Sequence, residues 1–265
     1  MSALSLRDAL PLAAAFTLLA GAAVAQTHTS HEAPAPSDPG AVMPGMAMQM
    51  EPPVMDQTIF AHVLFDQFEG RAGGNTTDFR WSGQGWVGTD YDKLWIKSEG
   101  FARNGKVEDG RHEFLYDRAI STSFDLQGGI RSDIDSNPTR NWAAFGIQGL
   151  APYFFNLEAT GYVSDQGHFA GRFETSYDLL ITQQLILQPE IEFNVYSKSD
   201  PARGVGAGFS DLDMGLRLRY EIDRKFAPYL GVAYESKFGQ TASFARRAGE
   251  STNGVRFLFG IRSWF

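Results

Sequence analysis

The sequence NGVRFLFGIRSWF, residues 253–265, ends the chain and decides its fold class. Counted back from Phe265 to Val255, every second residue is apolar except Ser263, and the residues between them include Trp264, Arg262 and Arg256. A period of two over this length predicts a β-strand with one apolar face and one mixed face. In a soluble β-sandwich the apolar face would need a second sheet to cover it, whereas in a membrane it would face lipid.

The other end of the chain carries a secretion signal. Arg7 precedes an apolar stretch that ends in the small-x-small cleavage motif AVA at 23–25, so residues 1–25 are predicted to be a signal peptide. No later run approaches the roughly 20 apolar residues that a membrane helix needs. A secreted chain that ends on an aromatic strand resembles the bacterial outer-membrane β-barrels, whose terminal Phe is read by the barrel-insertion machinery. We therefore expect that machinery as a partner, through the strand that ends at Phe265.

Residues 26–56 differ in composition from everything that follows. The segment is rich in proline and has no hydrophobic periodicity, so we expect a flexible periplasmic segment. Most of the methionines of the chain lie in it, although a disordered segment has no core for methionine to fill. Thioethers suit Cu(I), and imidazoles also suit Cu(II). We therefore predict copper capture by Met43, Met46, Met48, Met50, Met55, His28 and His31.

From residue 57 to 265 the sequence alternates strand-like runs with turn residues, and no run is convincingly helical. Most runs reach the roughly 9–11 residues of a tilted membrane strand. The predicted fold class is an all-β transmembrane antiparallel barrel of twelve strands. Ten strands is the fallback, because Pro189 removes a hydrogen-bond donor inside one run. The predicted strands are Ile59–Glu69, Phe79–Gly88, Lys93–Arg103, Glu108–Arg118, Ser123–Arg131, Arg140–Gly149, Phe154–Ser164, His168–Leu179, Leu185–Ser197, Ser210–Glu221, Ala227–Lys237 and Asn253–Phe265.

The predicted connections alternate in length, except that 104–107 and 165–167 are short where long ones are expected. Short ones, such as 89–92 and 222–226, would lie at one end of the barrel, and longer ones, such as 198–208 and 238–252, at the other. Outer-membrane barrels place their short turns in the periplasm. An even strand number then puts both termini in the periplasm. We expect the chain in the outer membrane of a Gram-negative bacterium, in contact with its lipids.

Charged residues are confined to one face of the predicted strands. In 185–197 the apolar residues would face lipid, while Glu190 and Glu192 would face the lumen. In 210–221 Arg217 and Arg219 would face the lumen in the same way. A base at mid-strand on a lipid face costs about 2–4 kcal/mol. This confinement therefore favours a barrel with a polar interior.

Several longer stretches resemble the copper resistance protein B family. They are LFDQFEG (64–70), DYDKLWIKSEG (90–100), LYDRAIS (115–121), GLAPYFFNLEATGYVSDQG (149–167), QPEIEFNVYSKSD (188–200), GFSDLDMGLRLRYEI (208–222) and FAPYLGV (226–232). A Met-rich periplasmic lead is also a trait of that family, although here it is short, with one compact cluster. The resemblance implies an outer-membrane barrel of a copper-tolerance system that binds copper and moves or sequesters it. It also implies other periplasmic copper proteins of the same system as partners.

Under this reading the lumen is expected to supply harder copper ligands than the methionines. Imidazole and carboxylate groups would bind Cu(II) along a path through the barrel. The alternative for each acid is a salt bridge with a lumen base. The selected lumen ligands are His62, Asp66, His168, Glu174, Glu190 and Glu192, and further acids expected on the path are Glu99, Glu113, Glu158, Asp211, Asp213 and Glu235.

Composition and motifs favour a protein that is not an enzyme. A net charge of −8 argues against nucleic acid as a partner and is compatible with attracting cations. The chain has no cysteine, and no catalytic motif appears. One alternative is a general cation-permeable porin, which leaves the methionine cluster unexplained. The other is an outer-membrane lipid hydrolase with a Ser-His pair on the lipid-facing rim. His112 is the histidine expected on that face, and no serine follows it at i+2.

Overall fold

The computed structural model describes residues 58–73, 76–103, 106–134 and 139–265. The predicted signal peptide (1–25) and the segment 26–56, with its methionines and histidines, lie outside the described residues. Those two assignments therefore stay predictions.

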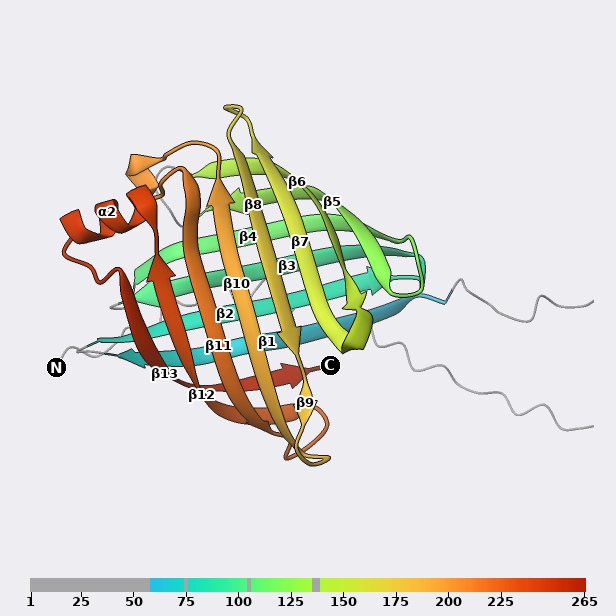
Figure 1. The fold of residues 1–265 in the computed structure, drawn as a ribbon. Coiled ribbons are helices and arrows are strands. Elements are labelled where there is room, and N and C mark those ends of the chain that lie inside the picture. Colours follow the sequence, from blue (N-terminus) through green and yellow to red (C-terminus); the bar gives the residue numbers. More distant parts are fainter. Residues whose placement is uncertain (1–57, 74–75, 104–105, 135–138) are drawn as a thin grey trace, which may run out of the picture.

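The described chain forms a closed antiparallel barrel (Figure 1). β8 and β9 are two pieces of one barrel strand, because both pair with β10. The predicted twelve-stranded barrel is therefore confirmed. The strands are β1 (Phe60–Gly73), β2 (Thr76–Gly88), β3 (Asp92–Arg103), β4 (Lys106–Ala119), β5 (Phe124–Asp133), β6 (Arg140–Ala151), β7 (Phe155–Ser164), β8 (Phe169–Tyr177), β9 (Leu179–Leu180), β10 (Leu185–Tyr196), β11 (Gly208–Tyr220), β12 (Phe226–Lys237) and β13 (Asn253–Trp264).

The barrel closes where the last strand meets the first. β13 pairs antiparallel with β1, and the terminal residue continues the ladder. The Phe265 N–H donates to the Val63 carbonyl oxygen at 2.9 Å, and the Val63 N–H donates to the Phe265 carbonyl oxygen at 3.0 Å. In Figure 1 the strands of the front wall cross those of the back wall at a clear angle. Closure of this kind leaves no unpaired sheet edge, so the aromatic terminal strand completes the wall.

The two ends of the barrel differ. The first residues of β1 and the end of β13 lie at one end with the connections 89–91, 120–123, 152–154, 181–184 and 221–225. We call this the terminus end. The opposite, helix end carries the longer connections after β5, β10 and β12. The predicted long connections 198–208 and 238–252 are confirmed. The predicted long connection 70–78 is wrong, because β1 and β2 extend further than predicted and leave only residues 74 and 75 between them.

Pro189 lies inside β10 without ending it. It pairs with Leu216 of β11 on one side. On the other side the pairing pauses, because β8 ends at Tyr177 and β9 begins at Leu179. Proline has no N–H to donate. The missing donor therefore falls at a pause in the ladder around Asp178, and the strand count survives.

The expectation that no segment is helical is wrong for one connection. α2 (Gly239–Arg247) lies between β12 and β13 and buries Thr241, Ala242 and Ala245. The Thr241 hydroxyl accepts a hydrogen bond from the Gly206 N–H at 2.8 Å. This anchoring supports a helix too short to be stable alone. Two short 3-10 turns, η1 (Pro152–Phe154) and η2 (Pro201–Arg203), complete the elements. In the part of the chain that the structure describes, no helix is long and apolar enough to cross a membrane.

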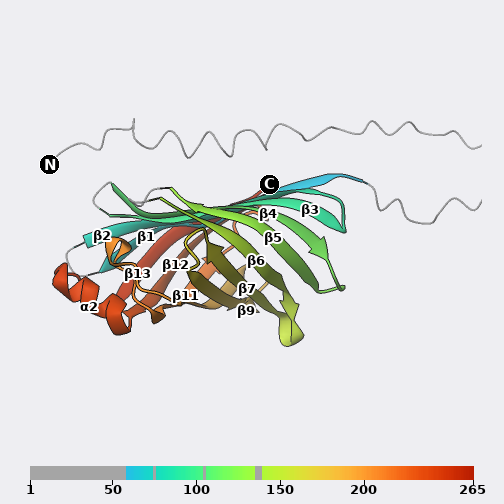
Figure 2. The same ribbon diagram turned by 90° about the horizontal axis from the view of Figure 1, so that it is seen from above.

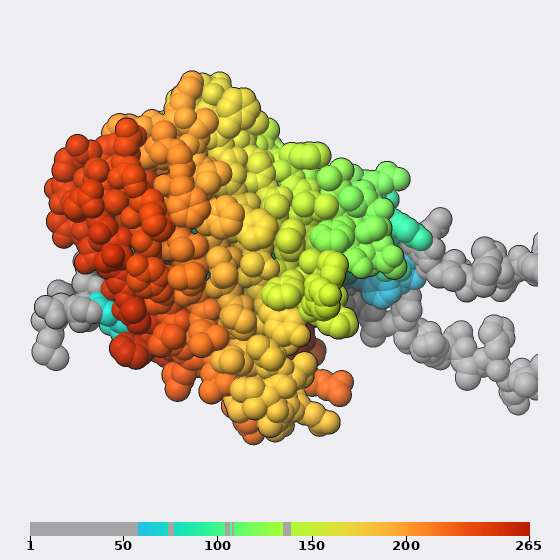
Figure 3. Space-filling view, viewed as in Figure 1, coloured from blue at the N-terminus to red at the C-terminus, as the bar shows by residue number. Residues whose placement is uncertain are grey.

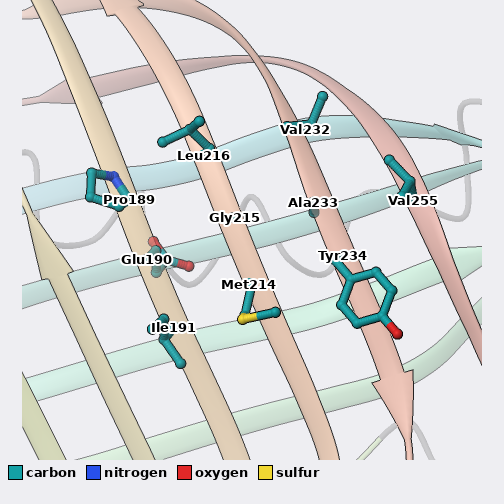
Figure 4. Close-up of a pocket in the computed structure, with 10 residues that line it drawn as sticks. All are labelled: Pro189, Glu190, Ile191, Met214, Gly215, Leu216, Val232, Ala233, Tyr234 and Val255. Carbon is teal, nitrogen blue, oxygen red and sulfur yellow. The ribbon is translucent and has the colours of Figure 1, made fainter.

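The outer face of the wall is apolar. Leu230, Phe257 and Phe145 are 68%, 66% and 65% exposed. A shallow groove of about 340 Å³ on this face is lined largely by aliphatic side chains, among them Met214 and Leu216 (Figure 4). The space-filling view shows the strands packed side by side without interruption (Figure 3). A face this apolar fits the hydrocarbon of a membrane.

Aromatic side chains gather on the outer face near both ends. Near the helix end Phe173, Phe193, Phe209 and Phe238 form a row, with ring centroids 5.1, 5.5 and 4.9 Å apart in turn. At the terminus end Phe155 and Tyr177 lie 4.9 Å apart, and the adjacent η1 turn exposes further aromatic side chains. Such girdles mark the membrane–water interfaces of outer-membrane barrels.

Candidate functional site

The inner face of the barrel is charged and buried. Glu190 and Glu192 on β10 are 6% and 7% exposed, and Arg217 and Arg219 on β11 are each 2% exposed. Their predicted position in the lumen is confirmed by contacts that cross the barrel. Ionised side chains removed from water need partners, so their partners decide what the lumen can do.

Arg172 of β8 is the most connected of these groups. Its Nη2 lies 2.9 Å from Glu99 Oε2 and 2.6 Å from Glu174 Oε2. Its Nε lies 3.0 Å from Glu192 Oε1, and its Nη1 lies 3.7 Å from Glu158 Oε1. These acids come from β3, β7, β8 and β10. One guanidinium therefore joins carboxylates from widely separated parts of the wall.

The network continues through two further arginines. Arg80 on β2 bonds Glu192 at 2.6 Å and Asp213 at 2.7 Å. Arg71 on β1 bonds the same Asp213 at 2.5 Å and Glu235 at 2.8 Å. Acids and bases thus alternate from β8 and β10 across to β12.

Glu190 belongs to a branch of the same network. Arg217 donates to both oxygens of Glu69, at 3.0 and 3.1 Å, and Arg71 donates to Glu69 Oε1 at 2.8 Å. The Arg217 Nη1 lies 3.1 Å from Glu190 Oε2. The Gln67 amide donates to Glu190 Oε1 at 2.9 Å. Both oxygens of Glu190 are therefore engaged.

Another part of the lumen is filled by a mixed cluster. Glu99 pairs with Arg111, and the Tyr162 hydroxyl donates to Glu113 Oε1 at 2.8 Å. Beside this pair lies a buried apolar group that closes the interior around β4, β6 and β7. Its members are Leu115, Trp142, Ala144 and Tyr162, with Trp95 and Ala170 packed against them.

The helix-end mouth is crossed by the connection between β10 and β11, residues 197–207. Arg203 of η2 forms ion pairs with Asp133 of β5 and with Asp109 of β4, the latter at 3.2 Å. Asp200 bonds Arg140 of β6 at 3.0 Å. Both anchor points lie several strands from β10 and β11 in the ring. The connection therefore bridges this mouth by ion pairs.

His168 lies at the same mouth. The predicted strand that began at His168 begins one residue later, at Phe169, and His168 closes the preceding turn by accepting the Ser164 N–H at 2.9 Å. It lines a small cavity with Trp142 and Arg203. Its predicted lumen side is thus correct, at the helix end.

The terminus-end mouth holds the other two selected ligands on β1. His62 faces Trp86 across the β1–β2 pair, with ring centroids 6.1 Å apart in a stacked arrangement. Asp66 lies at a bulge in β1 and bonds Arg262 of β13 at 2.8 Å. The bulge lets Asp66 face the lumen although the strand alternation changes there.

The structure separates the predicted ligands rather than gathering them. His62 and His168 lie at opposite mouths and cannot share an ion, while Glu174, Glu190 and Glu192 lie in the network between them. Within the described ranges, no group of three or more His, Asp or Glu side chains is placed to hold a metal ion. The other acids expected on the path (Glu99, Glu113, Glu158, Asp213 and Glu235) also lie in ion pairs, and Asp211 accepts from the Asn194 amide. Copper ligation by these residues stays a prediction.

The bases that organise the lumen were not selected from the sequence as site residues. Arg71, Arg80 and Arg172 hold the carboxylates in place, and each sits in the inward phase of its strand. Alternation alone could have found them as lumen residues. Alternation does not reveal their ion-pair partners, because these can be far away in the sequence: Arg71 and Asp213 are 142 positions apart.

His112 lies on the outer face, as expected. It pairs in register with Ser98 of β3 and Ser132 of β5, so serines flank it across strands rather than along its own strand. The Ser132 hydroxyl donates to the Asn141 side-chain oxygen at 2.8 Å, and the Ser98 hydroxyl accepts from the Trp81 indole at 3.3 Å.

Comparisons with known proteins agree with the fold and the sequence motifs. The solved structure of the NanC porin matches with a TM-score of 0.50 and 12% identity, covering 77% of this chain and 99% of that one. At this identity the likeness shows the fold. The KdgM porin matches with a TM-score of 0.45 and 13% identity over the same share of this chain.

Two curated relatives and one family model match the sequence itself. Copper resistance protein B of Escherichia coli is 46% identical over 212 residues, which are 80% of this chain and 72% of that protein. The copper resistance protein B homolog of Pseudomonas syringae pv. tomato is 42% identical over the same shares. The family model described as copper resistance protein B precursor matches residues 59–265. This chain, an outer-membrane β-barrel by its fold, therefore belongs to the copper resistance protein B family.

Proposed function

We propose that this protein binds copper, captures it in the periplasm, and sequesters it or passes it across the outer membrane, without enzymatic activity. The family and the soft methionine ligands support copper as the cargo. The observation that carries the proposal is the start of the barrel. β1 begins at Phe60 beside His62 and Asp66, so the methionine segment is tethered at the mouth that holds these two side chains.

The tether is short enough for direct transfer. Met55 and His62 are seven positions apart in the sequence, and seven extended residues span at most about 25 Å. Copper on the Met55 thioether is therefore within reach of the His62 imidazole. Met43, Met46, Met48, Met50, His28 and His31 extend the same tether and would collect copper further out.

We place the terminus end of the barrel in the periplasm. Both chain ends of the barrel and the short turns lie there, which is the arrangement of outer-membrane barrels. Phe265, 64% exposed at this end, would be the residue that the barrel-insertion machinery reads. Periplasmic copper proteins of the same resistance system would deliver copper to this mouth.

Beyond the mouth, copper would meet ion pairs rather than free ligands. Glu190 is engaged through both oxygens, as described above, and Glu192 accepts from Arg172 on one oxygen and from Arg80 on the other. The Asp66 and Glu174 side chains are more open, at 21% and 27% exposure. Binding at the terminus-end mouth therefore requires less rearrangement than passage, for which the network would have to open.

Replacement of Met43, Met46, Met48, Met50 and Met55 together by Leu tests the capture step. It keeps the segment apolar and removes its sulfur ligands, so Cu(I) binding by the mature protein should weaken while the barrel stays equally stable. Met214→Leu is the matched control, because Met214 lies on the outer wall. Competition with a chromogenic Cu(I) chelator measures the binding. Unchanged affinity in the fivefold variant would refute capture by the segment, and unchanged copper flux would favour a general cation porin.

The double variant Glu190→Gln, Glu192→Gln tests the lumen separately. It leaves every methionine in place and removes two carboxylates from the network. If the acids form a cation path, copper flux into liposomes should fall while Cu(I) binding is kept. If they serve only as ion-pair partners, the melting temperature should fall and flux per molecule should not change, which would exclude these two acids as a cation path.

A further inference from the structure

The two arginines of α2 differ from most arginines of this molecule in having no ion-pair partner among the described residues. In the described chain almost every arginine is ion-paired with a carboxylate, including Arg103 near α2. Arg224, Arg246 and Arg247 have no ion-pair partner among the described residues, and all three are exposed. Arg246 and Arg247 are adjacent on the last turn of α2. The nearest acid in sequence, Glu250, is bonded to Lys237 and Arg103 instead.

The helix is held rigidly at the rim. Its Thr241 hydroxyl contacts the Ser210 hydroxyl at 3.0 Å in addition to the Gly206 N–H. Gly206 approaches so closely that a Cβ there would lie 2.5 Å from both Gln240 Cβ and the Thr241 nitrogen. The arginines therefore project from a fixed support. Figure 2, in which the molecule is turned by 90°, shows α2 at the helix end of the barrel, where it packs against β11 and β12.

The height of α2 relative to the membrane follows from the aromatic row. Phe238, the last ring of the row, directly precedes the helix, and its ring centroid lies 4.9 Å from that of Phe209. Aromatic girdles mark the level of lipid headgroups. The helix that starts at this ring is therefore placed where lipid phosphates lie.

The two side chains are also partly preorganised. The Arg247 guanidinium lies 4.7 Å from the Phe244 ring centroid, and Arg246 donates to the Ser243 hydroxyl at 3.2 Å. Each keeps further N–H groups free for a ligand, because guanidinium carries five donors. Arginine binds phosphate through paired hydrogen bonds. Basic residues stabilise the negative, C-terminal end of a helix, which explains a preference for positive charge there. This effect does not use the further N–H donors of the two guanidiniums.

We propose that Arg246 and Arg247 bind a phosphate group of a lipid A-type glycolipid in the leaflet that surrounds the helix end. The choice of this leaflet rests on the orientation given under the proposed function. The aromatic row, which ends at Phe238 at the start of α2, would contact acyl chains of the surrounding lipid, while the arginines on the last turn of the helix would contact the phosphate. Copper handling at the opposite mouth does not depend on this contact.

The test compares variants at the two ends of the full mature protein, refolded in phosphatidylcholine vesicles with and without lipid A. The variant Arg246→Gln, Arg247→Gln removes the site. The control Arg224→Gln, Lys225→Gln removes the same charge from an exposed turn at the terminus end. Lipid A affinity should fall at least about tenfold in the first variant, as expected for loss of one or two charge-assisted contacts. It should stay at the wild-type value in the control.

Equal binding by the α2 variant and the wild type would overturn the proposal, and so would an equal loss in the control. Phosphatidylglycerol vesicles that compete as well as lipid A would refute the glycolipid as the ligand. A third variant, Arg246→Lys with Arg247→Lys, keeps the charge and should retain part of the affinity. Circular dichroism and heat-modifiable gel mobility confirm that each variant is folded. Cu(I) affinity should not change in any of them, which separates this test from the test of copper capture.

Discussion

The two faces of the barrel wall follow opposite rules, as β11 shows. Its outward Met214, Leu216 and Leu218 are 39%, 42% and 41% exposed, whereas its inward Arg217 and Arg219 are each 2% exposed. Apolar side chains thus lie on the outer surface of the barrel, and charged side chains lie in its interior. The hydrophobic contribution comes from lipid outside, while the interior is stabilised by charge pairing. Substitutions should therefore have opposite consequences on the two faces.

Removal of a central base from the lumen should cause the largest loss of stability. Arg172→Ala leaves the carboxylates of Glu99, Glu158, Glu174 and Glu192 without their shared partner. Breaking a buried pair in this way costs about 3–5 kcal/mol. Urea unfolding of the barrel in vesicles measures the loss. Arg224→Ala, at an exposed arginine without an ion pair, is the control and should change stability by less than about 0.5 kcal/mol. Similar losses in the two variants would mean that the lumen network is not what holds the interior together.

A base on the outer face should have the next largest effect. Leu216→Arg puts a charge at mid-wall on the lipid side, which costs about 2–4 kcal/mol. Ile222→Arg, in the turn after β11, is a matched control near the interface and should cost no more than about 1 kcal/mol. The same unfolding assay compares the two. If Leu216→Arg proved as mild as the control, the level of the membrane on this wall would need to be revised.

The smallest effect is expected at the rim, where water screens charges. Glu250 accepts a hydrogen bond from Lys237 Nζ at 2.8 Å, and this bond, with the charges of Lys237 and Arg103, lowers the pKa of Glu250 from its usual 4.5. A lowered folded-state pKa contributes stability that is full above the unfolded value and is lost as the pH falls through the folded value. The melting temperature of wild type should thus exceed that of Glu250→Gln slightly at pH 7. The difference should shrink below about pH 4.5, and a difference that grows in acid would contradict this assignment.

Most of the fold could be predicted from the sequence because a membrane wall imposes alternation on every strand. Alternation reveals an inner and an outer face in the terminal run 253–265 and in the runs around Glu190 and Arg217. α2 could not be predicted in this way. It is short, begins with glycine and has no side chain that caps its first turn, so only its docking against Gly206 and Ser210 supports it.

The candidate site was predicted in composition but not in connectivity. Alternation puts Glu190, Glu192 and Arg217 in the lumen, whereas the barrel's tilt and closure decide which of them meet. The bulge at Asp66 adds one residue to β1, and no residue typical of turns or bulges near it in the sequence indicates its position. Contacts such as Arg203 with Asp133 depend on a connection that folds back over the mouth, which no pattern within either segment encodes.

The start of β1 beside His62 has a consequence for how strong a mouth site needs to be. Two sites joined by a short flexible linker see each other at an effective concentration in the millimolar range. A copper ion that stays on the methionine segment while the mouth residues also bind it would therefore half-occupy the mouth even if their affinity for the loaded segment is only about millimolar. Such a site would be nearly empty in free solution at micromolar copper. His62 and Asp66 could then act as a weak acceptor that fills only when the neighbouring segment is loaded, and that releases its ion readily.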